Sequence, residues 1–422
     1  MRFAVCALVL VACGFKPTPV TGDGGSNGGD DADGGGAGSD AGPMLGPCGT
    51  PGAIRDDFDD GMIANQWRSS RMVMETGGEL VVTPDDSMRF GGYISKHGVD
   101  LTGSQVTVEV TQMIQSTMFG TAAMYLFADN THYVAFTVRD GLLSAEWALG
   151  GAATDVPIAY DPSLHRWWRI LEHADLIVWQ TSPDGTTWTE LTTLPSQMTP
   201  WKNRLAIGLG GYSDTPHGAV HFDNLNLGLA QAGWCSADTF MDPFARTAVG
   251  FDWVARREPA MGPGCTAQVN NGVQLDQPGF VSRCWLATAQ AFDLRHSQAM
   301  VFIPGIVTSK PGWKVFLRAI SDVVTDAFLV QFDNGQLCAQ VRSDPPTCVG
   351  YQSDTFLYWR LREDAGTLYF EASQNAASWT SVFATPDPFA LDTLELQLGT
   401  DATQGFTGGP LPLKMGAYNQ LN

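Results

Sequence analysis

The sequence has few positive charges. It contains 24 Lys and Arg against 44 Asp and Glu, which gives a formal net charge of -20 at pH 7. Nucleic acids and anionic membrane surfaces are bound by clusters of Lys and Arg that displace counterions from phosphate groups. We therefore expect no nucleic-acid partner and no electrostatic attachment to a membrane.

The sequence also lacks a long apolar run. The run from Phe3 to Ala12 has ten residues, whereas a membrane-spanning helix needs about 20. A short apolar run after a basic residue, here Arg2, is typical of an export signal. Attachment to a membrane would therefore depend on lipid added to the chain.

Signatures of common catalytic and metal sites are missing as well. No two Cys have the Cys-x-x-Cys spacing of zinc sites, the seven His form no triad-like or metal-binding pattern, and no phosphate-binding Gly-rich loop occurs. These absences exclude zinc and nucleotide chemistry. No long segment has the 3.6-residue period of a helix, so we expect an all-β protein.

The N-terminal segment points to the cell envelope. The export signal ends in Leu10-Val11-Ala12-Cys13-Gly14, which resembles the lipobox of bacterial lipoproteins. The resemblance implies a signal peptide over residues 1–12, a lipid on Cys13 and, from Gly14, transfer to the outer membrane. A signal peptide cleaved elsewhere is the alternative. Residues 13–47 are rich in Gly and Asp and poor in apolar residues, so after the lipidated Cys we expect a disordered linker.

The rest of the chain repeats itself. Trp168 is followed after twenty residues by Trp188, as Trp359 is by Trp379. The segment Asp57-Phe58-Asp59 corresponds to Thr239-Phe240-Met241-Asp242 in the second copy. Both copies alternate apolar and polar residues and contain Asn-Gly or Asp-Gly turn signals. We therefore predict two tandem β-sandwich domains, residues 48–234 and 235–422.

Alternation in both copies predicts the residues of the two cores. The inward positions of the first copy are Val106, Val108, Val110, Val134, Phe136, Val138, Ile177, Trp179, Leu205, Ile207 and Leu209. Their counterparts are Ala299, Val301, Ile303, Phe328, Val330, Phe332, Leu368, Phe370, Leu394, Leu396 and Leu398. We also expect in the core the repeated tryptophans, which are Trp67, Trp168 and Trp188 with Trp253, Trp359 and Trp379.

Three segments of the first copy form a family pattern. They are Asp56-Asp57-Phe58-Asp59-Asp60-Gly61, the turn from Ser182 through Asp184-Gly185 to Trp188-Thr189, and Val220-His221-Phe222-Asp223-Asn224-Leu225. With them the copy resembles a concanavalin A-like lectin/glucanase (laminin G-like) jelly roll. The second copy departs from the pattern, with Gln374-Asn375-Ala376-Ala377 at the turn and Tyr418-Asn419 at the end. The resemblance implies two jelly-roll domains that bind carbohydrate.

The same resemblance bears on catalysis. Glucanases of this superfamily carry Glu-x-Asp-x-x-Glu or a shorter variant on one strand, because retaining hydrolysis needs two carboxylates about 5 Å apart. Neither pattern occurs here, so we expect a binding protein that is not an enzyme. A divergent glycoside hydrolase is one alternative, with outward carboxylates from separate strands, namely Glu109, Glu146, Glu371 and Glu395. A structural envelope protein that binds another protein is the other alternative.

A calcium ion is the one cofactor that the resemblance implies. Jelly rolls of this kind often hold a hard cation between the first and last strands through carboxylate and carbonyl oxygens. The matching residues are Asp57 or Asp59 together with Asp223, and Asn224 could assist. Alternatively, these acidic residues only keep a strand edge soluble.

Candidate ligand-binding residues follow from the way sugars are bound, by stacking on flat aromatic side chains with a few polar contacts. Trp201, Tyr212 and Trp313 are predicted in loops and have no counterpart in the other copy. Strand residues predicted to point outward complete the set, and these are Tyr125, Tyr133, Arg139, Arg318 and Tyr369. The alternative is an ordinary solvated sheet face.

Six Cys remain if Cys6 is removed with the signal peptide and Cys13 is lipidated. In an oxidising compartment this number predicts three disulfides. Cys265–Cys284 and Cys338–Cys348 would each close a short loop, and Cys48–Cys235 would join the two ends of the first domain.

Overall fold

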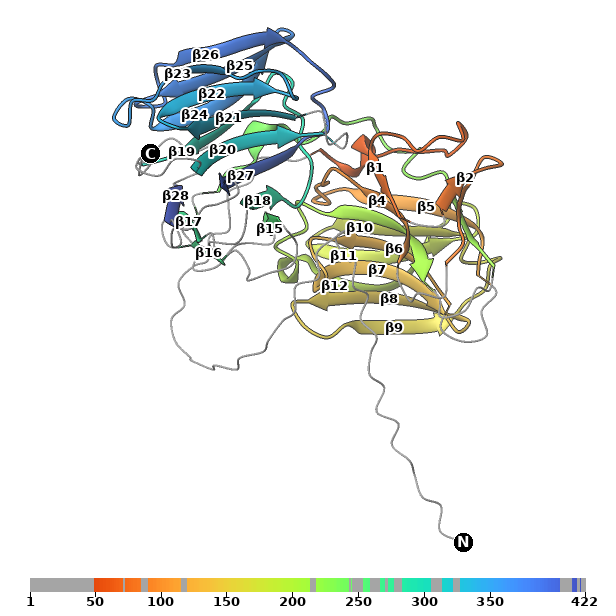
Figure 1. Ribbon diagram of the computed structural model, residues 1–422. Coiled ribbons are helices and arrows are strands. Elements are labelled where there is room, and N and C mark those ends of the chain that lie inside the picture. Colours follow the sequence, from red (N-terminus) through yellow and green to blue (C-terminus); the bar gives the residue numbers. More distant parts are fainter. Residues whose placement is uncertain are drawn as a thin grey trace, which may run out of the picture. The chain divides into compact units, whose positions relative to one another are not determined.

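The computed structural model describes residues 49–70, 73–84, 90–114, 120–212, 218–242, 244, 253–258, 266–269, 272–276, 283–304, 313–321, 327–402, 412–415 and 418. They divide into two compact units (Figure 1), of which the first comprises Thr50–Ser95 and Asp100–Gln231 and the second includes Lys96–Val99 and Ala232–Asn422. We call these units the first and second domains. The predicted all-β class is confirmed, because the only helices among the described residues are the single 3-10 turns Pro51–Ala53, Ser196–Met198 and Ala237–Thr239. None of the described helices has the length and apolar character needed to cross a bilayer.

The first domain is a jelly-roll sandwich of two seven-stranded antiparallel sheets, which we name the front and the back sheet. In spatial order, the front sheet contains β1 (Trp67–Ser69), β4 (Gly91–Ser95), β13 (Ala206–Tyr212), β6 (Thr121–Phe127), β7 (His132–Arg139), β8 (Leu142–Leu149) and β9 (Thr154–Ala159). The back sheet contains β12 (Thr189–Pro195), β11 (Leu176–Ser182), β10 (Trp167–His173), β5 (Gln105–Gln112), β14 (Val220–Asp223), β3 (Leu80–Val82) and β2 (Val73–Glu75).

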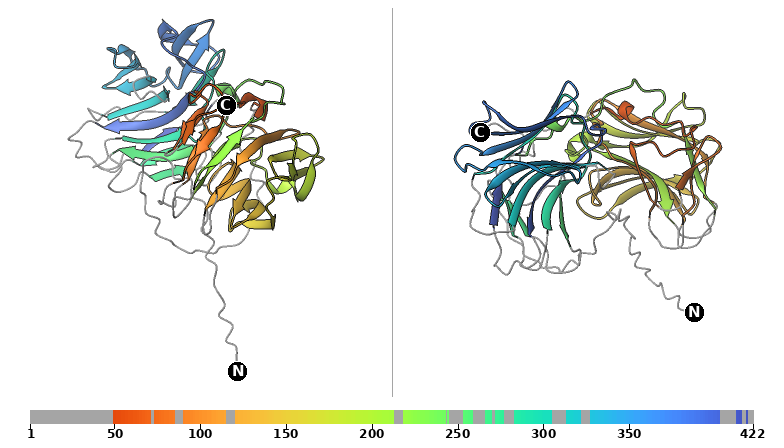
Figure 2. Two further views of the ribbon diagram at one scale, coloured as in Figure 1. Left: turned by 90° about the vertical axis from the view of Figure 1, so that its right-hand side faces the viewer. Right: turned by 45° about the horizontal axis from the view of Figure 1, so that its top comes forward.

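The second domain repeats this arrangement with one interruption. Its front sheet contains β15 (Trp253–Glu258), β18 (Arg283–Thr288), β27 (Glu395–Ala402), β20 (Trp313–Ile320), β21 (Ala327–Asp333), β22 (Gln336–Val341) and β23 (Thr347–Gly350). Its back strands are β26 (Thr380–Pro386), β25 (Thr367–Ser373), β24 (Tyr358–Asp364) and β19 (Gln298–Phe302), followed by β28 (Pro412–Met415), β17 (Val273–Asp276) and β16 (Thr266–Val269). Between β19 and β28, an isolated bridge from Val301 to Tyr418 links the two parts. Figure 2 shows the strands of each domain from two further sides.

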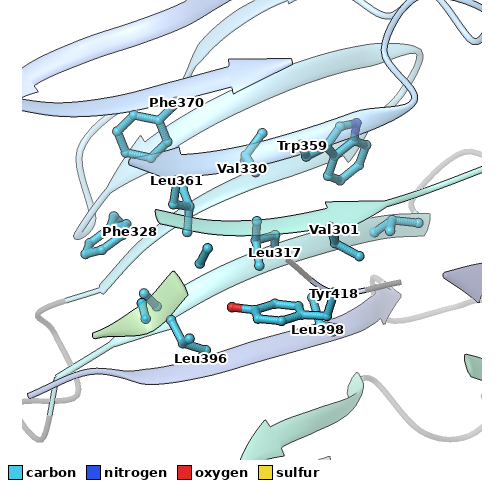
Figure 3. Packing of buried hydrophobic residues seen from close by; sticks show 14 of the residues in the cluster. Val301, Leu317, Phe328, Val330, Trp359, Leu361, Phe370, Leu396, Leu398 and Tyr418 are labelled. Atoms are coloured by element: carbon cyan, nitrogen blue, oxygen red, sulfur yellow. The ribbon is translucent and has the colours of Figure 1, made fainter. Parts of the chain in front are cut away.

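The core of each domain lies between its front and back sheets. All the inward positions predicted from alternation are buried, so that part of the prediction is confirmed. In the second domain, Leu317, Val330 and Leu398 of the front sheet face Trp359, Leu361 and Phe370 of the back sheet (Figure 3). Burial of such apolar side chains is the main favourable term in folding and holds the two sheets together.

An aspartate, partly buried in the first domain and buried in the second, closes the base of each domain. The Trp67 indole Nε1 donates to Asp56 Oδ2 at 2.6 Å, and the Trp253 indole Nε1 donates to Asp242 Oδ2 at 2.9 Å. The backbone of Asp56 exchanges two hydrogen bonds with Leu225, and that of Asp242 does so with Tyr418. The first and last segments of each domain are therefore joined at the same point.

This junction corrects one predicted alignment between the copies. The backbone N–H of Phe58 donates to Asp56, and that of Phe244 donates to Asp242. Both phenylalanines have positive φ, 53° and 50°. Phe58 therefore corresponds to Phe244 and not to Phe240. The equivalent position is defined by the backbone conformation and hydrogen bonds at the junction rather than by local sequence similarity.

The third tryptophan pair is also corrected. Trp67, Trp168, Trp253 and Trp359 are buried as predicted, whereas Trp188 and Trp379 are only partly buried and are not core residues. Arg169 lies 3.9 Å from the centre of the Trp188 ring, and Arg360 lies 3.8 Å from that of Trp379. In both copies this tryptophan therefore packs against an arginine guanidinium through a cation–π contact.

Only four of the six cysteines in the predicted pairs belong to the described residues. Cys338 and Cys348 form a disulfide across β22 and β23, as predicted. Cys235 and Cys284 are also disulfide-bonded, while their predicted partners Cys48 and Cys265 lie outside the described residues. Cys13, the signal peptide and the linker likewise lie outside them.

Replacing Asp56 by Ala is expected to destabilise the first domain. The change leaves the Trp67 indole N–H buried without its acceptor, at a cost of about 2 kcal/mol in the free energy of unfolding. Chemical denaturation, fitted with a separate transition for each domain and recorded in chelator, measures the cost. Asp57→Ala, at the exposed neighbour, should change the free energy by less than about 0.5 kcal/mol. Equal effects of the two substitutions would show that the aspartate–indole bond does not hold the base together.

Candidate functional site

The candidate site is the outward face of the front sheet of the first domain. Since Val134, Phe136 and Val138 of β7 point into the core, their neighbours in the strand point outward. We name the outward side chains of this sheet and its flank the tyrosine face, comprising Phe90, Thr121, Tyr125, Phe127, Tyr133, Thr137, Arg139, Glu146 and Tyr212.

Glycines in β13 make room for aromatic rings on this face. A Cβ at Gly210 would lie 2.6 Å from the Phe90 ring, and one at Gly208 would lie 3.3 Å from the Phe127 ring. Phe90 also contacts Tyr125 edge-on, with ring centres 6.1 Å apart. The sequence analysis missed Phe90 and Phe127, although the alternating glycines Gly208 and Gly210 in an otherwise apolar strand are a signal for a ring above the sheet.

Glu146 of β8 is the carboxylate of the tyrosine face. The Tyr133 hydroxyl donates to its Oε1 at 2.6 Å, and the Thr137 hydroxyl donates to its Oε2 at 3.1 Å. Burial, followed by the charge of Glu146, raises the pKa of Tyr133 well above its usual value, so the phenol stays protonated and can donate. Asp155 of β9 lies directly opposite Glu146 in the strand register.

The structure brings together four of the predicted ligand residues. Tyr125 and Tyr133 are in edge-to-face contact at 5.5 Å. Burial raises the pKa of Tyr125, and the charges of Glu146, Tyr212 and Tyr133 raise it further. The positive charge of Arg139 lowers this pKa. Tyr212 and Arg139 lie in one row across the sheet, separated by Thr121. These side chains therefore belong to one electrostatic environment.

The burial of two of these residues corrects the prediction that they contact a ligand. Tyr125 is only 1% exposed and Tyr133 only 3%, so neither ring offers a surface on which a sugar could stack. Their alternation was predicted correctly, but Phe90, Phe127 and neighbouring groups pack over them. Tyr125 and Tyr133 support the face, whereas the partly exposed Tyr212 and the exposed Arg139 can contact a ligand.

Two predicted stacking residues are buried elsewhere. Trp201 is 4% exposed and packs edge-on against His132 at 6.0 Å. Trp313 is 3% exposed and belongs to the core of the second domain, because β20 begins at Trp313 and its alternation places this residue on the same side as Val315 and Leu317. Trp201 lies in a turn as predicted but is covered, whereas the prediction that Trp313 lies in a loop is wrong.

The last two predicted residues lie on different sheets of the second domain. Arg318 projects from the front sheet, opposite Gln397 in the register. Tyr369 belongs to β25 of the back sheet, where the Arg362 guanidinium lies 4.3 Å from its ring centre. Arg318 and Tyr369 therefore do not share a sheet face, since alternation identifies the side of a strand but not the sheet that contains it.

The predicted calcium ligands lie at the edge of the first domain. Burial raises the pKa of Asp223 to about 6, and the negative charges of Glu109, Asp59 and Glu79 add to the increase. Asp57 and Asp59 are both exposed, and Asp223 is partly exposed. Among the described residues, no group of three or more His, Cys, Asp or Glu side chains could hold a metal ion. Calcium stays a prediction that would need backbone carbonyls as further ligands.

Glu109, one of the carboxylates considered for hydrolysis, is engaged in structural contacts. The Arg166 Nε donates to its Oε1 at 2.5 Å, and the Asn224 amide donates to its Oε2 at 2.6 Å. In the second domain, Glu371 pairs with Arg360 and Arg362. Both glutamates belong to back-sheet networks and are separate from the tyrosine face.

Comparisons with known proteins gave no match to a family model and none to a curated protein. Solved structures with a similar fold include the apo Crh5 transglycosylase, at 15% identity and TM-score 0.32, covering 42% of this chain and 82% of that one. Another is a glycoside hydrolase family 16 endo-glucanase from Bacteroides ovatus, at 11% identity and TM-score 0.33, covering 42% and 98%. The Bacillus licheniformis beta-glucanase has 9% identity and TM-score 0.32, covering 42% and 95%. We transfer no residue role from these structures.

Replacing Asp223 by Asn is expected to raise stability at neutral pH. A raised pKa in the folded state means that the stabilising contribution of protonated Asp223 is complete below about pH 4 and is lost as the pH rises through about 6. In chelator, Asp223→Asn should melt higher than the wild type above pH 6 and at the same temperature near pH 3.5. Thermal unfolding from pH 3.5 to 8 tests this, and a temperature difference that does not depend on pH would contradict it.

The same pair of proteins tests the calcium prediction. If Asp223 is a calcium ligand, adding calcium at pH 7 should raise the melting temperature of the wild type and leave that of Asp223→Asn unchanged. Magnesium serves as the control cation. No calcium-dependent shift in the wild type would remove the proposed site.

Proposed function

We propose that the chain binds carbohydrate through the tyrosine face without cleaving it. The observation that supports this best is the combination of partly exposed aromatic rings with a small number of oriented polar groups. Tyr212 and Arg139 border the face, and Glu146 is held in place by Tyr133 and Thr137. Apolar rings that stack on a pyranose, together with a few fixed donors and acceptors, are the elements of sugar recognition.

An unpartnered hydroxyl on the same face supports a ligand. Thr121 is almost fully buried, and its Oγ1 has no hydrogen-bond partner among the described residues. It lies between Tyr212 and Arg139 in the cross-strand row. Buried hydroxyl groups normally find a partner, and a bound sugar hydroxyl would supply one here.

Binding without hydrolysis fits the contacts of Glu146. Both of its oxygens accept hydrogen bonds from neighbouring hydroxyls, so the side chain is fixed as an acceptor. One observation favours the alternative of a divergent glycoside hydrolase, because Asp155 lies opposite Glu146 and would supply a second carboxylate. We therefore keep hydrolysis as the second candidate function.

The proposal includes display at the cell envelope. The export signal, Cys13 and the Gly- and Asp-rich linker would anchor the two domains by lipid and leave them free to reach a glycan. Expression with a tagged fatty acid should label the wild-type chain and not Cys13→Ser. Equal labelling of both chains would contradict lipidation at Cys13.

Tyr212→Ala and Arg139→Ala are each expected to weaken glycan binding at least tenfold, because each removes a ligand contact worth about 1.4 kcal/mol. A glycan array followed by calorimetric titration with the best ligand measures the loss, and circular dichroism confirms the fold. Leu164→Ala, at an exposed apolar residue outside the face, is the control and should bind normally. An array without any bound glycan would contradict the proposal and favour a protein partner.

The hydrolysis alternative has a separate readout. The wild type is incubated with a panel of polysaccharides, and released reducing ends are measured. We expect no release. Release that disappears in Glu146→Gln, while affinity for the glycan is retained, would replace the binding proposal by the hydrolase.

A further inference from the structure

The front sheet of the second domain presents an outward face of different composition. Leu396 and Leu398 of β27 point into the core (Figure 3), so Gln397 between them points outward. By the same alternation, Trp285 of β18 and Phe316 of β20 point outward. All three lie on adjacent strands, with β27 in the middle.

Gln397 has a buried acceptor without a partner. The Gln397 Nε2 donates to Glu395 Oε1 at 2.6 Å. A carboxylate oxygen accepts hydrogen bonds from an amide nitrogen, so this contact determines which end of the amide faces Glu395. The Oε1 at the other end is buried and has no partner among the described residues, and the whole residue is only 4% exposed.

Trp285 adds a buried donor on the neighbouring strand. Its indole Nε1 is buried and has no partner within the described parts of the chain. By contrast, Trp359 donates to the Phe356 carbonyl at 3.0 Å and Trp379 donates to the Ala376 carbonyl at 3.1 Å. Trp285 lies opposite Gly399 and is thus a diagonal neighbour of Gln397 on the same face.

Gly399 lies between Trp285 and Phe316 on the middle strand. A Cβ at this position would lie 2.5 Å from Trp285 Cβ and 2.6 Å from the Phe316 ring. The absence of a side chain therefore lets both residues approach the strand. Phe316 is 5% exposed and supports the face, whereas Trp285 is partly exposed and supplies an apolar surface beside the unpartnered donor and acceptor.

The charged residues next to this surface are paired. Lys314 Nζ lies 3.2 Å from Asp333 Oδ2, and Arg283 Nη2 lies 2.9 Å from Asp401 Oδ2. Lys314 also lies opposite Asp401 in the register, so cations and anions alternate along the row. Arg318, opposite Gln397, and Glu395, which accepts from Gln397, add one charge of each sign. The face therefore carries no excess of either sign, and the ligand that fits it is neutral.

We propose that Trp285, Phe316 and Gln397 form a second binding site, for a neutral sugar that carries an acetamido group. Such a group presents a carbonyl oxygen beside an N–H. The carbonyl accepts from the Trp285 indole, the N–H donates to Gln397 Oε1, and the methyl and ring carbons pack on the partly exposed Trp285, which Phe316 supports. The site shares its general ligand class with the proposed function but uses none of the residues of the tyrosine face.

The test titrates the full chain with N-acetylglucosamine tetramer and, separately, with glucose tetramer, which has hydroxyls only. The wild type should bind the acetamido sugar at least tenfold more tightly. Trp285→Phe and Gln397→Met should each lower that affinity at least tenfold. Equal affinity for the two sugars, or variants that bind like the wild type, would overturn the proposal.

Unfolding temperatures separate a binding role from a structural one. Without ligand, Trp285→Phe should unfold within about 3 °C of the wild type, because the indole N–H that it removes has no partner to lose. Gln397→Met also removes the amide donor to Glu395, so its unfolding temperature should fall somewhat further. Trp359→Phe is the matched control for Trp285→Phe, since it removes an indole N–H that is bonded, and should unfold at a clearly lower temperature. If Trp285→Phe lost as much stability as this control, its effect on affinity would reflect misfolding and the site would be refuted.

Failure of this site can be told apart from failure of the first. Tyr212→Ala changes only the tyrosine face and should leave binding of the acetamido sugar intact. If Tyr212→Ala abolished all sugar binding while Trp285→Phe changed none, the second site would be refuted and the first retained. The reverse pattern would retain the second site and refute the first.

Discussion

The bond between an aspartate carboxylate and a buried indole N–H organises both domains. In each, the aspartate accepts from the tryptophan eleven residues later, and its backbone pairs with a residue near the end of the domain. Asp242 is buried and Asp56 is partly buried, so their contacts must replace the hydration that is lost. Burial indeed raises the pKa of Asp56, while Trp67, Phe58 and Gln66 act in the opposite direction as donors. The sandwich above this junction depends on the two chain ends meeting there.

On this common frame the two outward faces differ in chemistry. The strand registers place Gly208, Tyr125 and Glu146 of the first domain in the positions of Gln397, Arg318 and Gln340 of the second. The core positions between them stay apolar in both. Substitution on the outward side changes no packing between the sheets, which explains how one face became rich in tyrosine and the other rich in amides.

Glycine has the same use in both domains. Gly210 lies under Phe90, and Gly399 lies between Trp285 and Phe316. A glycine weakens a strand, because it costs backbone entropy and buries no side chain. At the equivalent places in β13 and β27, a Cβ would meet the backbone oxygen of Gly91 or Cys284 as well as an aromatic residue, so both the close approach of the neighbouring strand and the ring require glycine. Both proposed sites are built above such a glycine.

The amino-acid sequence by itself determined the all-β class, the repeat and the core. Period-two alternation along a strand is a local property, and two diverged copies that alternate in step reveal which side is inward. Tertiary structure alone decided the rest. Tyr125 and Tyr133 alternate correctly yet are covered, Trp313 begins a strand and turns inward, and Tyr369 lies on a different sheet from Arg318. Which sheet a strand joins, and which rings lie over it, depends on pairing between segments far apart in the chain, and no local pattern encodes that pairing.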